Sequence, residues 1–359
     1  MPTKELCVVV TTLVVIGLVF IYSSSSVYAL ERHGFAHFFL LKQIGGVILG
    51  LVGLLCIRRI PAYLIEQYSG FLFMGSVIVT AITLIPRWGL MVHGSRRWLL
   101  LGGMSIQPSE LMKYSAIIYY AHLLTKKQYQ IRSWRGTLPY VIVLLIPICI
   151  LLAQPDFGQA VTLGTTACML WFIMQPPLAM LIMGIAGGLI GALILILKAP
   201  YRLRRLMIFL NPWNDPHGAG FQIIQSLIAI GSGGWFGRGI TGSKQKFFYL
   251  PMQHTDFIGA IIAEETGFFG LSFLLIMYLL FLYYGMRCAL LCSKITYMLT
   301  IVGIVSLIAL QSGFNMAVIC GIVPTKGISL PFVSYGNSSL VATLWALGVI
   351  LSYSKGREI

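Results

Sequence analysis

Apolar residues follow one another along the chain in ten long blocks, and polar residues gather in the segments between them. A block of roughly 20 mostly apolar residues is what a helix needs to cross the hydrocarbon core of a bilayer. The pattern therefore predicts an all-α polytopic membrane protein with about ten transmembrane helices. The predicted spans are residues 6–27, 37–57, 64–86, 107–124, 138–154, 159–175, 178–198, 256–286, 296–324 and 336–354.

Composition supports this interpretation, because 58% of the residues are hydrophobic and only 10% are charged. Soluble domains of this size are not built that way. The longest predicted connection is a loop at about 199–255, between the seventh and eighth spans. No polar stretch is long enough for a separate soluble domain, so residues 1–359 are predicted to form one membrane domain. Glycines inside the spans, as at Gly46, Gly50 and in "GIAGGLIG" (184–191), predict close helix packing.

The positions of Lys and Arg predict the orientation. The N-terminus, every second connection and the C-terminus carry eleven basic residues: Lys4, Arg58, Arg59, Lys126, Lys127, Arg132, Arg135, Arg287, Lys294, Lys355 and Arg357. The opposite short loops carry five: Arg32, Arg87, Arg96, Arg97 and Lys326. Both termini are therefore predicted to be cytoplasmic. Seven more basic residues in or beside the 199–255 loop make the outer face positive, which indicates either an anionic partner or contact with lipid headgroups.

Polar residues inside or beside spans are costly, so they indicate partners or function. In "VHGSRRWLLLGGMSIQPSELMK" (92–113), a Gly-rich turn precedes a helix that starts near Pro108, with Ser109 as its predicted cap. Glu110 and Lys113 are three residues apart and share one helical face. They are predicted either to form a structural ion pair or to line an outward-facing cavity, where Arg97 and Lys113 can contact phosphate oxygens.

Two acidic motifs lie at the predicted outer side. In "QPDFGQA" (154–160), Asp156 sits at a tight turn and can cap the helix that follows. In "YLPMQHTDFIGAIIAEETGFFG" (249–270), Asp256 lies where the eighth span begins and can be its N-cap. Residues His254, Asp256 and Glu264 do not form a zinc-binding HExxH pattern. A Mg²⁺ or Mn²⁺ ion carried with a substrate pyrophosphate fits better, with Asp256 as a ligand, because Mg²⁺ prefers carboxylate and phosphate oxygens.

Uncharged polar residues form the last cluster. Gln311, Ser312 and Asn315 share one face of the ninth span, and Ser338 and Ser339 begin the tenth. Such groups suit either a cavity that binds sugars or amides, or hydrogen bonds between helices. The segment "GSGGWFG" (231–237) is not a nucleotide-binding loop, because no strand precedes it.

These motifs, in this order, resemble the SEDS family (FtsW, RodA and SpoVE), and the resemblance covers nearly the whole chain. It is carried by "GSRRW", "QPSELMK", "QPDFGQA", "FLNPWNDPHGAGFQIIQSLIAIGSGG", "QKFFYLPMQHTDFIGAIIAEETGF" and "PTKGISLPFVSYGNSSL". Within the family the chain is more similar to the FtsW/SpoVE division branch than to RodA. It departs from the family pattern at His93, Met252 and Asn337.

The resemblance implies a ten-span peptidoglycan glycosyltransferase of the cytoplasmic (inner) membrane. Such a protein polymerises lipid II at the outer face, during cell division, by inverting attack of a sugar 4-hydroxyl with polyprenyl pyrophosphate leaving. The implied partners are a class B penicillin-binding protein, other division proteins and membrane lipids, but no nucleic acid. Asp256 occupies the position of the family's essential Asp and is predicted to act as the general base or to orient the acceptor hydroxyl. The predicted substrate-binding residues are Arg97, Glu110, Lys113, His254, Gln311, Ser312, Asn315, Lys326 and Ser338.

Glu264 and Glu265 are predicted to satisfy polar partners between helices, or to help hold a cation, and are given no catalytic step. Two other functions fit the same spans. A lipid II flippase would need charged groups along the whole path through the membrane, whereas the clusters here concentrate at the outer ends. A non-catalytic division scaffold would predict that Asp256 is dispensable.

Overall fold

The structure is a computed structural model that describes residues 2–92, 94–101, 104–126, 134–216, 218, 220–246, 251, 253–325 and 327–355. The candidate residue Lys326 and the departures His93 and Met252 lie outside this range. The helices are α1 (Pro2–His33), α2 (Phe38–Arg59), α3 (Ala62–Gln67), α4 (Ser69–Ile82), α5 (Pro108–Lys126), α6 (Trp134–Ala153), α7 (Phe157–Ile173), α8 (Leu178–Leu197), α9 (Pro200–Leu210), α10 (Phe221–Gly233), α11 (Ile258–Leu290), α12 (Ile295–Ile319) and α13 (Asn337–Ser354). A short 3₁₀ turn, η2 (Pro212–Asn214), follows α9.

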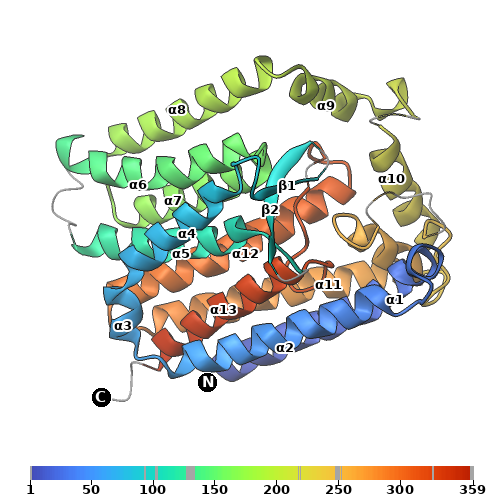
Figure 1. The fold of residues 1–359 in the computed structure, drawn as a ribbon, viewed down its shortest axis with the longest axis horizontal. Helices are drawn as coiled ribbons and strands as arrows, with labels where there is room; N and C mark the ends of the chain where they lie inside the picture. The colour runs from blue at the N-terminus through green and yellow to red at the C-terminus, as the bar shows by residue number, and fades with distance from the viewer. Residues whose placement is uncertain are drawn as a thin grey trace.

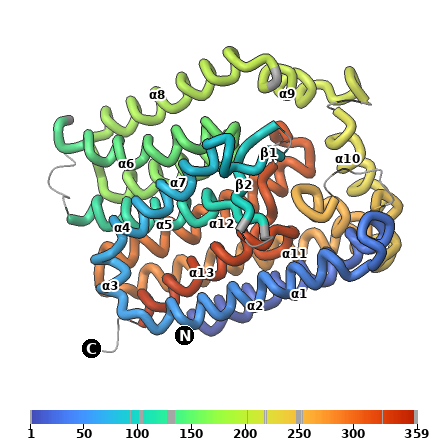
Figure 2. The backbone as a smooth tube through the Cα atoms, in the orientation of Figure 1, coloured from blue at the N-terminus to red at the C-terminus, as the bar shows by residue number. Residues whose placement is uncertain are grey.

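The fold is a bundle of long apolar helices (Figure 1). Within the described residues, seven helices are long and apolar enough to cross a membrane: α1, α2, α6, α8, α11, α12 and α13. The other three predicted spans correspond to the α3–α4 pair, to α5 and to α7. The start of α1 and the end of α13 lie at one end of the bundle, while α9 and α10 lie at the other (Figure 2). That both termini are cytoplasmic stays a prediction.

The core of the bundle is formed by α12 and α13, in which 78% and 72% of the most apolar stretch is buried, against 11% in α8. Helix α2 packs along α13, α11 along α12, and α1 along α11. Gly46 and Gly50 confirm the predicted role of glycine in packing, since a β-carbon at Gly50 would come within 2.4 Å of the Leu344 side chain. The same prediction is wrong for Gly187, Gly188 and Gly191 of α8, where a β-carbon would meet no described atom within 4 Å.

The prediction of an all-α fold is wrong at residues 89–106. They form a three-stranded antiparallel sheet of β1 (Gly89–Val92), β2 (Ser95–Leu101) and β3 (Met104–Ile106). Val92 pairs with Ser95, and Gly94 has a φ of +75°, as a tight hairpin turn requires. The sheet carries Arg97 on its central strand and leads directly into α5.

The predicted 199–255 loop also contains regular structure, namely helices α9 and α10. After α10, residues 234–239 pack against a break in α11, where Gly267 has φ +69° and ψ −163°. The N–H groups of Arg238 and Gly239 donate to the carbonyls of Glu264 and Glu265, and Phe268 and Phe269 donate to the carbonyls of Gly234 and Trp235. Backbone groups freed by a break in a membrane helix need such partners. The segment "GSGGWFG" thus stabilises the interrupted helix.

Candidate active site

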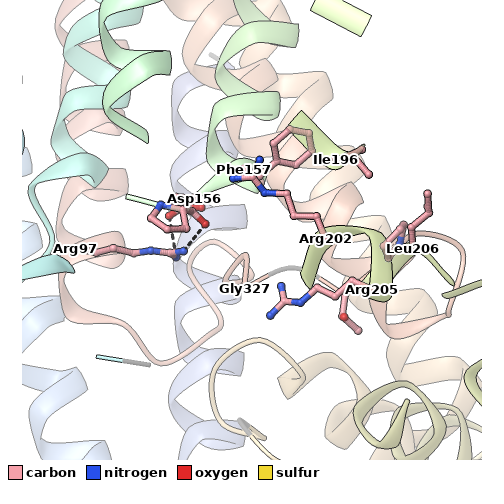
Figure 3. A pocket seen from close by; sticks show the side chains of 12 residues that line it. Arg97, Asp156, Phe157, Ile196, Arg202, Arg205, Leu206 and Gly327 are labelled. Atoms are coloured by element: carbon pink, nitrogen blue, oxygen red, sulfur yellow. Dashed lines mark hydrogen bonds and ion pairs between the residues drawn. The ribbon is translucent and has the colours of Figure 1, made fainter. Parts of the chain in front are cut away.

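A cleft of about 150 Å³ opens at the end of the bundle that carries α9 (Figure 3). Its walls come from β2, the α6–α7 turn, the end of α8, α9, and the connection between α12 and α13. The lining residues are Arg97, Pro155, Asp156, Phe157, Gly158, Ile196, Arg202, Arg205, Leu206, Pro324, Thr325 and Gly327. Three of these side chains are guanidinium groups, so the cleft favours an anionic ligand.

Arg97 holds the α6–α7 turn from β2. Its Nε donates to the carbonyl of Gln154 at 2.8 Å, its Nη2 to the carbonyl of Pro155 at 2.7 Å, and its Nη1 pairs with Asp156 Oδ2 at 3.1 Å. Asp156 is the N-cap of α7, as predicted, because Oδ1 accepts from the Gln159 backbone N–H at 3.4 Å. Burial raises the pKa of Asp156, and the Arg97 guanidinium counteracts part of that rise. Arg97 therefore positions the turn and still borders the cleft.

Asp256 lies in the segment before α11, half-buried beside the cleft wall. A β-carbon on Gly327, a lining residue, would stand 3.3 Å from Asp256 Oδ2. The predicted N-cap role is wrong: the helix begins at Ile258, its N-cap is Phe257, and no side chain caps it. Burial raises the pKa of Asp256 from 3.8 to about 7; Asp156 contributes to the rise and Arg97 opposes it. Burial therefore has a larger effect on this pKa than the nearby Arg97 guanidinium.

Glu110 and Lys113 form the predicted ion pair, with Nζ 3.1 Å from Oε2. Glu110 Oε1 also accepts from Gln159 Nε2 at 2.6 Å. Pro108 is the first residue of α5, but Ser109 lies inside its first turn and is not the preceding cap. The Lys113 side chain is 0% exposed and does not line the cleft. The pair holds α5 against α7, and contact between Lys113 and a phosphate stays a prediction that requires the pair to open.

Glu264 and Glu265 satisfy polar partners, as predicted. Glu265 accepts from the Ser23 hydroxyl of α1, at 2.6 and 2.8 Å to its two oxygens. Glu264 accepts from the Ser243 hydroxyl and from the Lys244 backbone N–H at 3.0 Å. Its carboxylate also lies 3.7 Å from Arg238 Nη1. Glu264 thus fastens the segment after α10 to α11, whereas Glu265 joins α1 to α11.

The remaining candidate residues lie in two places. His254 packs its ring against Tyr28, Phe39 and Tyr335, with centroids 4.7 to 5.8 Å apart, and burial lowers its pKa to about 4. The ring is therefore uncharged at neutral pH. Ser338 accepts from the Gln107 backbone N–H at 3.0 Å, which joins the start of α13 to the start of α5.

The uncharged group on α12 is buried, and two of its members bond to backbone. Ser312 donates to the carbonyl of Ile308 within its own helix at 2.9 Å. Asn315 donates to the carbonyls of Asp256 and Ile328, at 2.7 and 2.8 Å. Gln311 is buried on the same helix. Two cleft residues, Arg202 and Arg205, were counted in the basic loop but not singled out, because the sequence does not indicate which side of α9 faces the cleft.

Residues 4–358 match the model of the FtsW/RodA/SpoVE family, which is described as "Cell cycle protein". Stage V sporulation protein E of Bacillus subtilis (strain 168) is 39% identical over 355 residues, which cover 99% of this chain and 97% of the relative. A probable peptidoglycan glycosyltransferase FtsW of Saccharophagus degradans is 40% identical over 348 residues, covering 95% of this chain and 89% of the relative.

Solved structures agree with these relatives. A chain from the work "Structural coordination of polymerization and crosslinking by a peptidoglycan synthase complex" superposes with a TM-score of 0.81 at 30% identity, covering 98% of this chain and 97% of that one. The rod shape determining protein RodA of Thermus thermophilus superposes with a TM-score of 0.73 at 26% identity, covering 99% of this chain and 97% of that one.

Proposed function

Since the chain belongs to the FtsW/RodA/SpoVE family, we propose that it is a peptidoglycan glycosyltransferase that polymerises lipid II during cell division. The resemblance drawn from its motifs is confirmed by the family model and by relatives over the full length of the chain. One structural observation carries the proposal: the Asp256 carboxylate lies against Gly327, in the wall of a cleft bordered by Arg97, Arg202 and Arg205.

The reaction joins the 4-hydroxyl oxygen of one sugar to the anomeric carbon of another, while the bond from that carbon to the pyrophosphate oxygen breaks. The hydroxyl proton passes to the Asp256 carboxylate, and the bonding electron pair leaves with the polyprenyl pyrophosphate. A general base is most effective when its pKa lies near the working pH, and that of Asp256 is raised to about 7. Pyrophosphate leaves as an anion, so no second carboxylic acid has to protonate it, unlike the leaving group of a glycosidase.

The three arginines are the groups that stabilise the departing charge. Arg202 and Arg205 project from α9 on one side of the cleft, and Arg97 lies on the other (Figure 3). One guanidinium group can donate to two phosphate oxygens at once, and it stays charged at every physiological pH. A leaving pyrophosphate between them would meet positive charge on both sides as its own charge develops.

A divalent cation would enter this site with the substrate. Within the part of the chain that the structure describes, no group of three or more His, Cys, Asp and Glu side chains could hold a metal ion. A Mg²⁺ or Mn²⁺ ion would therefore take most of its ligands from the pyrophosphate and water, with Asp256 as the protein carboxylate. Such an ion would neutralise phosphate charge, while Arg97 and Asp256 keep the roles given above.

The membrane topology follows from the same proposal. Ten spans, with α3–α4, α5 and α7 completing the seven long helices, bring both termini to the cytoplasm and place α9, α10 and the cleft outside. The protein then resides in the cytoplasmic membrane with its cleft open to the outer face. A class B penicillin-binding protein and other division proteins are the proposed partners; one of the similar solved chains comes from a peptidoglycan synthase complex.

The test is a polymerisation assay with labelled lipid II and the complex of this protein with its class B penicillin-binding protein. We expect long glycan strands from wild type and none from Asp256→Asn, with Mg²⁺ or Mn²⁺ supplied. Asp215→Asn is the matched control, because Asp215 pairs with Arg204 outside the cleft lining and should leave activity unchanged. An intact wild-type complex that makes no strands would favour the flippase, whereas an active Asp256→Asn variant would favour the scaffold or another base.

A further inference from the structure

The connection between α12 and α13 folds back into the bundle. Residues 327–336 have no regular secondary structure, yet Leu330, Phe332 and Val333 are each no more than 3% exposed. The Tyr278 hydroxyl of α11 donates to the carbonyl of Pro331 at 2.5 Å. Buried backbone without helix or sheet bonds needs side-chain partners, so the surrounding helices fix the path of this segment.

Gln43 of α2 holds the end of the segment. Its Nε2 donates to the carbonyl of Ser334 at 3.3 Å, and its Oε1 accepts from the Gly336 N–H at 3.2 Å. The Leu330 N–H donates to the Ser334 hydroxyl oxygen at 2.8 Å, which closes a tight turn. Ser334 is thereby fixed both at its backbone and at its side chain.

Three successive carbonyls around Asp256 are held by hydrogen bonds, two from this fixed segment and one from α12. The carbonyl of His254 accepts from the Tyr335 N–H at 2.9 Å. The carbonyl of Thr255 accepts from the Ser334 hydroxyl at 2.6 Å. The carbonyl of Asp256 accepts from Asn315 Nδ2 of α12 at 2.7 Å. Consecutive carbonyls held from different elements leave the 254–256 backbone little freedom to turn.

Asn315 uses its donors fully in this arrangement. Its amide nitrogen has two N–H bonds. One goes to the Asp256 carbonyl and the other to the carbonyl of Ile328, at 2.8 Å. The same side chain therefore ties both segments that meet at the carboxylate. Asn315 was predicted to bind substrate, and both of its N–H bonds are already taken by these two carbonyls.

Resting on the proposed glycosyltransferase function, we propose that Ser334 and Asn315 are positioning residues for Asp256. They do not contact the reacting atoms. They hold the carbonyls of Thr255 and Asp256, and through them they keep the carboxylate beside Gly327 and directed at the cleft. A base displaced by about 1 Å from its productive position can lose on the order of 100-fold in rate.

The test uses the full chain in complex with its penicillin-binding protein and labelled lipid II. Ser334→Ala and Asn315→Ala are compared with Ser334→Thr, which keeps the hydroxyl. The matched control is Ser352→Ala, because Ser352 is also buried and donates to a distant carbonyl, that of Ile60, at 2.7 Å, far from the cleft. Polymerisation kcat and KM and the unfolding temperature are measured for each variant.

We expect Ser334→Ala and Asn315→Ala to lower kcat by roughly 10- to 100-fold with KM for lipid II little changed, and Ser334→Thr to recover most of the activity. Ser352→Ala should leave both kcat and KM unchanged.

Two results would overturn the proposal while wild type stays active: alanine variants with unchanged kcat, or a raised KM at constant kcat, which marks substrate contact. Inactive wild type would instead refute the underlying function. If Ser334→Ala does not fold, Asn315→Ala decides, because it leaves both hydrogen bonds of the Ser334 hydroxyl in place.

Discussion

The Asp256 carboxylate lies beside Gly327, where a β-carbon would come within 3.3 Å of Oδ2. Gly327 lines the cleft, so this contact brings the carboxylate next to the cleft wall. The separation is tighter than ordinary van der Waals contact to a methyl group. A side chain at residue 327 would crowd Oδ2 of the carboxylate that the proposed mechanism assigns to the attacking hydroxyl.

Gly327→Ala should therefore lower kcat by about 10-fold or more, since the methyl group competes with the acceptor for one face of the base. Its backbone conformation does not require glycine, so the variant should fold. Gly313→Ala is the control, because a β-carbon there meets no described atom within 4 Å. Strand synthesis by Gly327→Ala at the wild-type rate would mean that the acceptor approaches Asp256 from another side.

The sequence predicts the parts of this site that depend on local spacing or on the membrane itself. Long apolar blocks mark the helices, because lipid allows few other structures. Glu110 and Lys113 pair because residues three apart share a helical face. Asp156 caps α7 because Asp before a helix commonly does.

Local reasoning fails where distant segments decide the conformation. Asp256 was predicted to cap α11, but hydrogen bonds from Asn315 and Ser334 hold the carbonyls of Asp256 and Thr255. Those partners lie 59 and 79 residues away along the chain. The sheet at 89–106 was missed because its apolar strands continue the hydrophobic pattern of the neighbouring spans. Lining of the cleft by Arg205 depends on the direction of α9, which the sequence does not specify.

Polymerisation should depend on pH through Asp256. A base must be ionised, and burial raises the pKa of this carboxyl to about 7, so kcat should rise with pH through about 7 and fall below it. Asp156 contributes to that rise, and Asp156→Asn keeps a side-chain oxygen for the cap while it removes the charge. The acidic limb of the kcat–pH profile should then lie at lower pH in Asp156→Asn, whereas Asp215→Asn should leave it unchanged. If the acidic limb of the wild-type profile lies near pH 4, the Asp256 carboxylate is well hydrated and the prediction is wrong.

The arginines of α9 should differ in their effect on lipid II binding. Arg205 lines the cleft, while its neighbour Arg204 pairs with Asp215 at 2.9 Å. Arg205→Ala should raise KM for lipid II by roughly 10-fold, the equivalent of one lost charge-assisted contact, and Arg204→Ala should change it little. Titrations at low and high salt check the electrostatic origin, because added salt should narrow the difference. Equal KM values for the two variants would remove α9 from the headgroup site.

The interrupted helix α11 should tolerate no side chain at its break. Gly267 has a φ of +69° with ψ −163°, a conformation open almost only to glycine. A β-carbon there would also lie 2.4 Å from the Gly237 nitrogen and 2.5 Å from the Trp235 carbonyl oxygen. Backbone strain of this kind costs about 1–3 kcal/mol, and the clash adds to it.

Gly267→Ala should therefore lower the unfolding temperature sharply in detergent, as measured by thermal size-exclusion of the purified protein. Gly231→Ala, where a β-carbon meets no described atom within 4 Å, should leave that temperature unchanged. If Gly267→Ala is as stable as Gly231→Ala, the segment after α10 does not pack into the break. The hydrogen bonds that Arg238 and Gly239 donate to α11 would then not be what stabilises the interrupted helix.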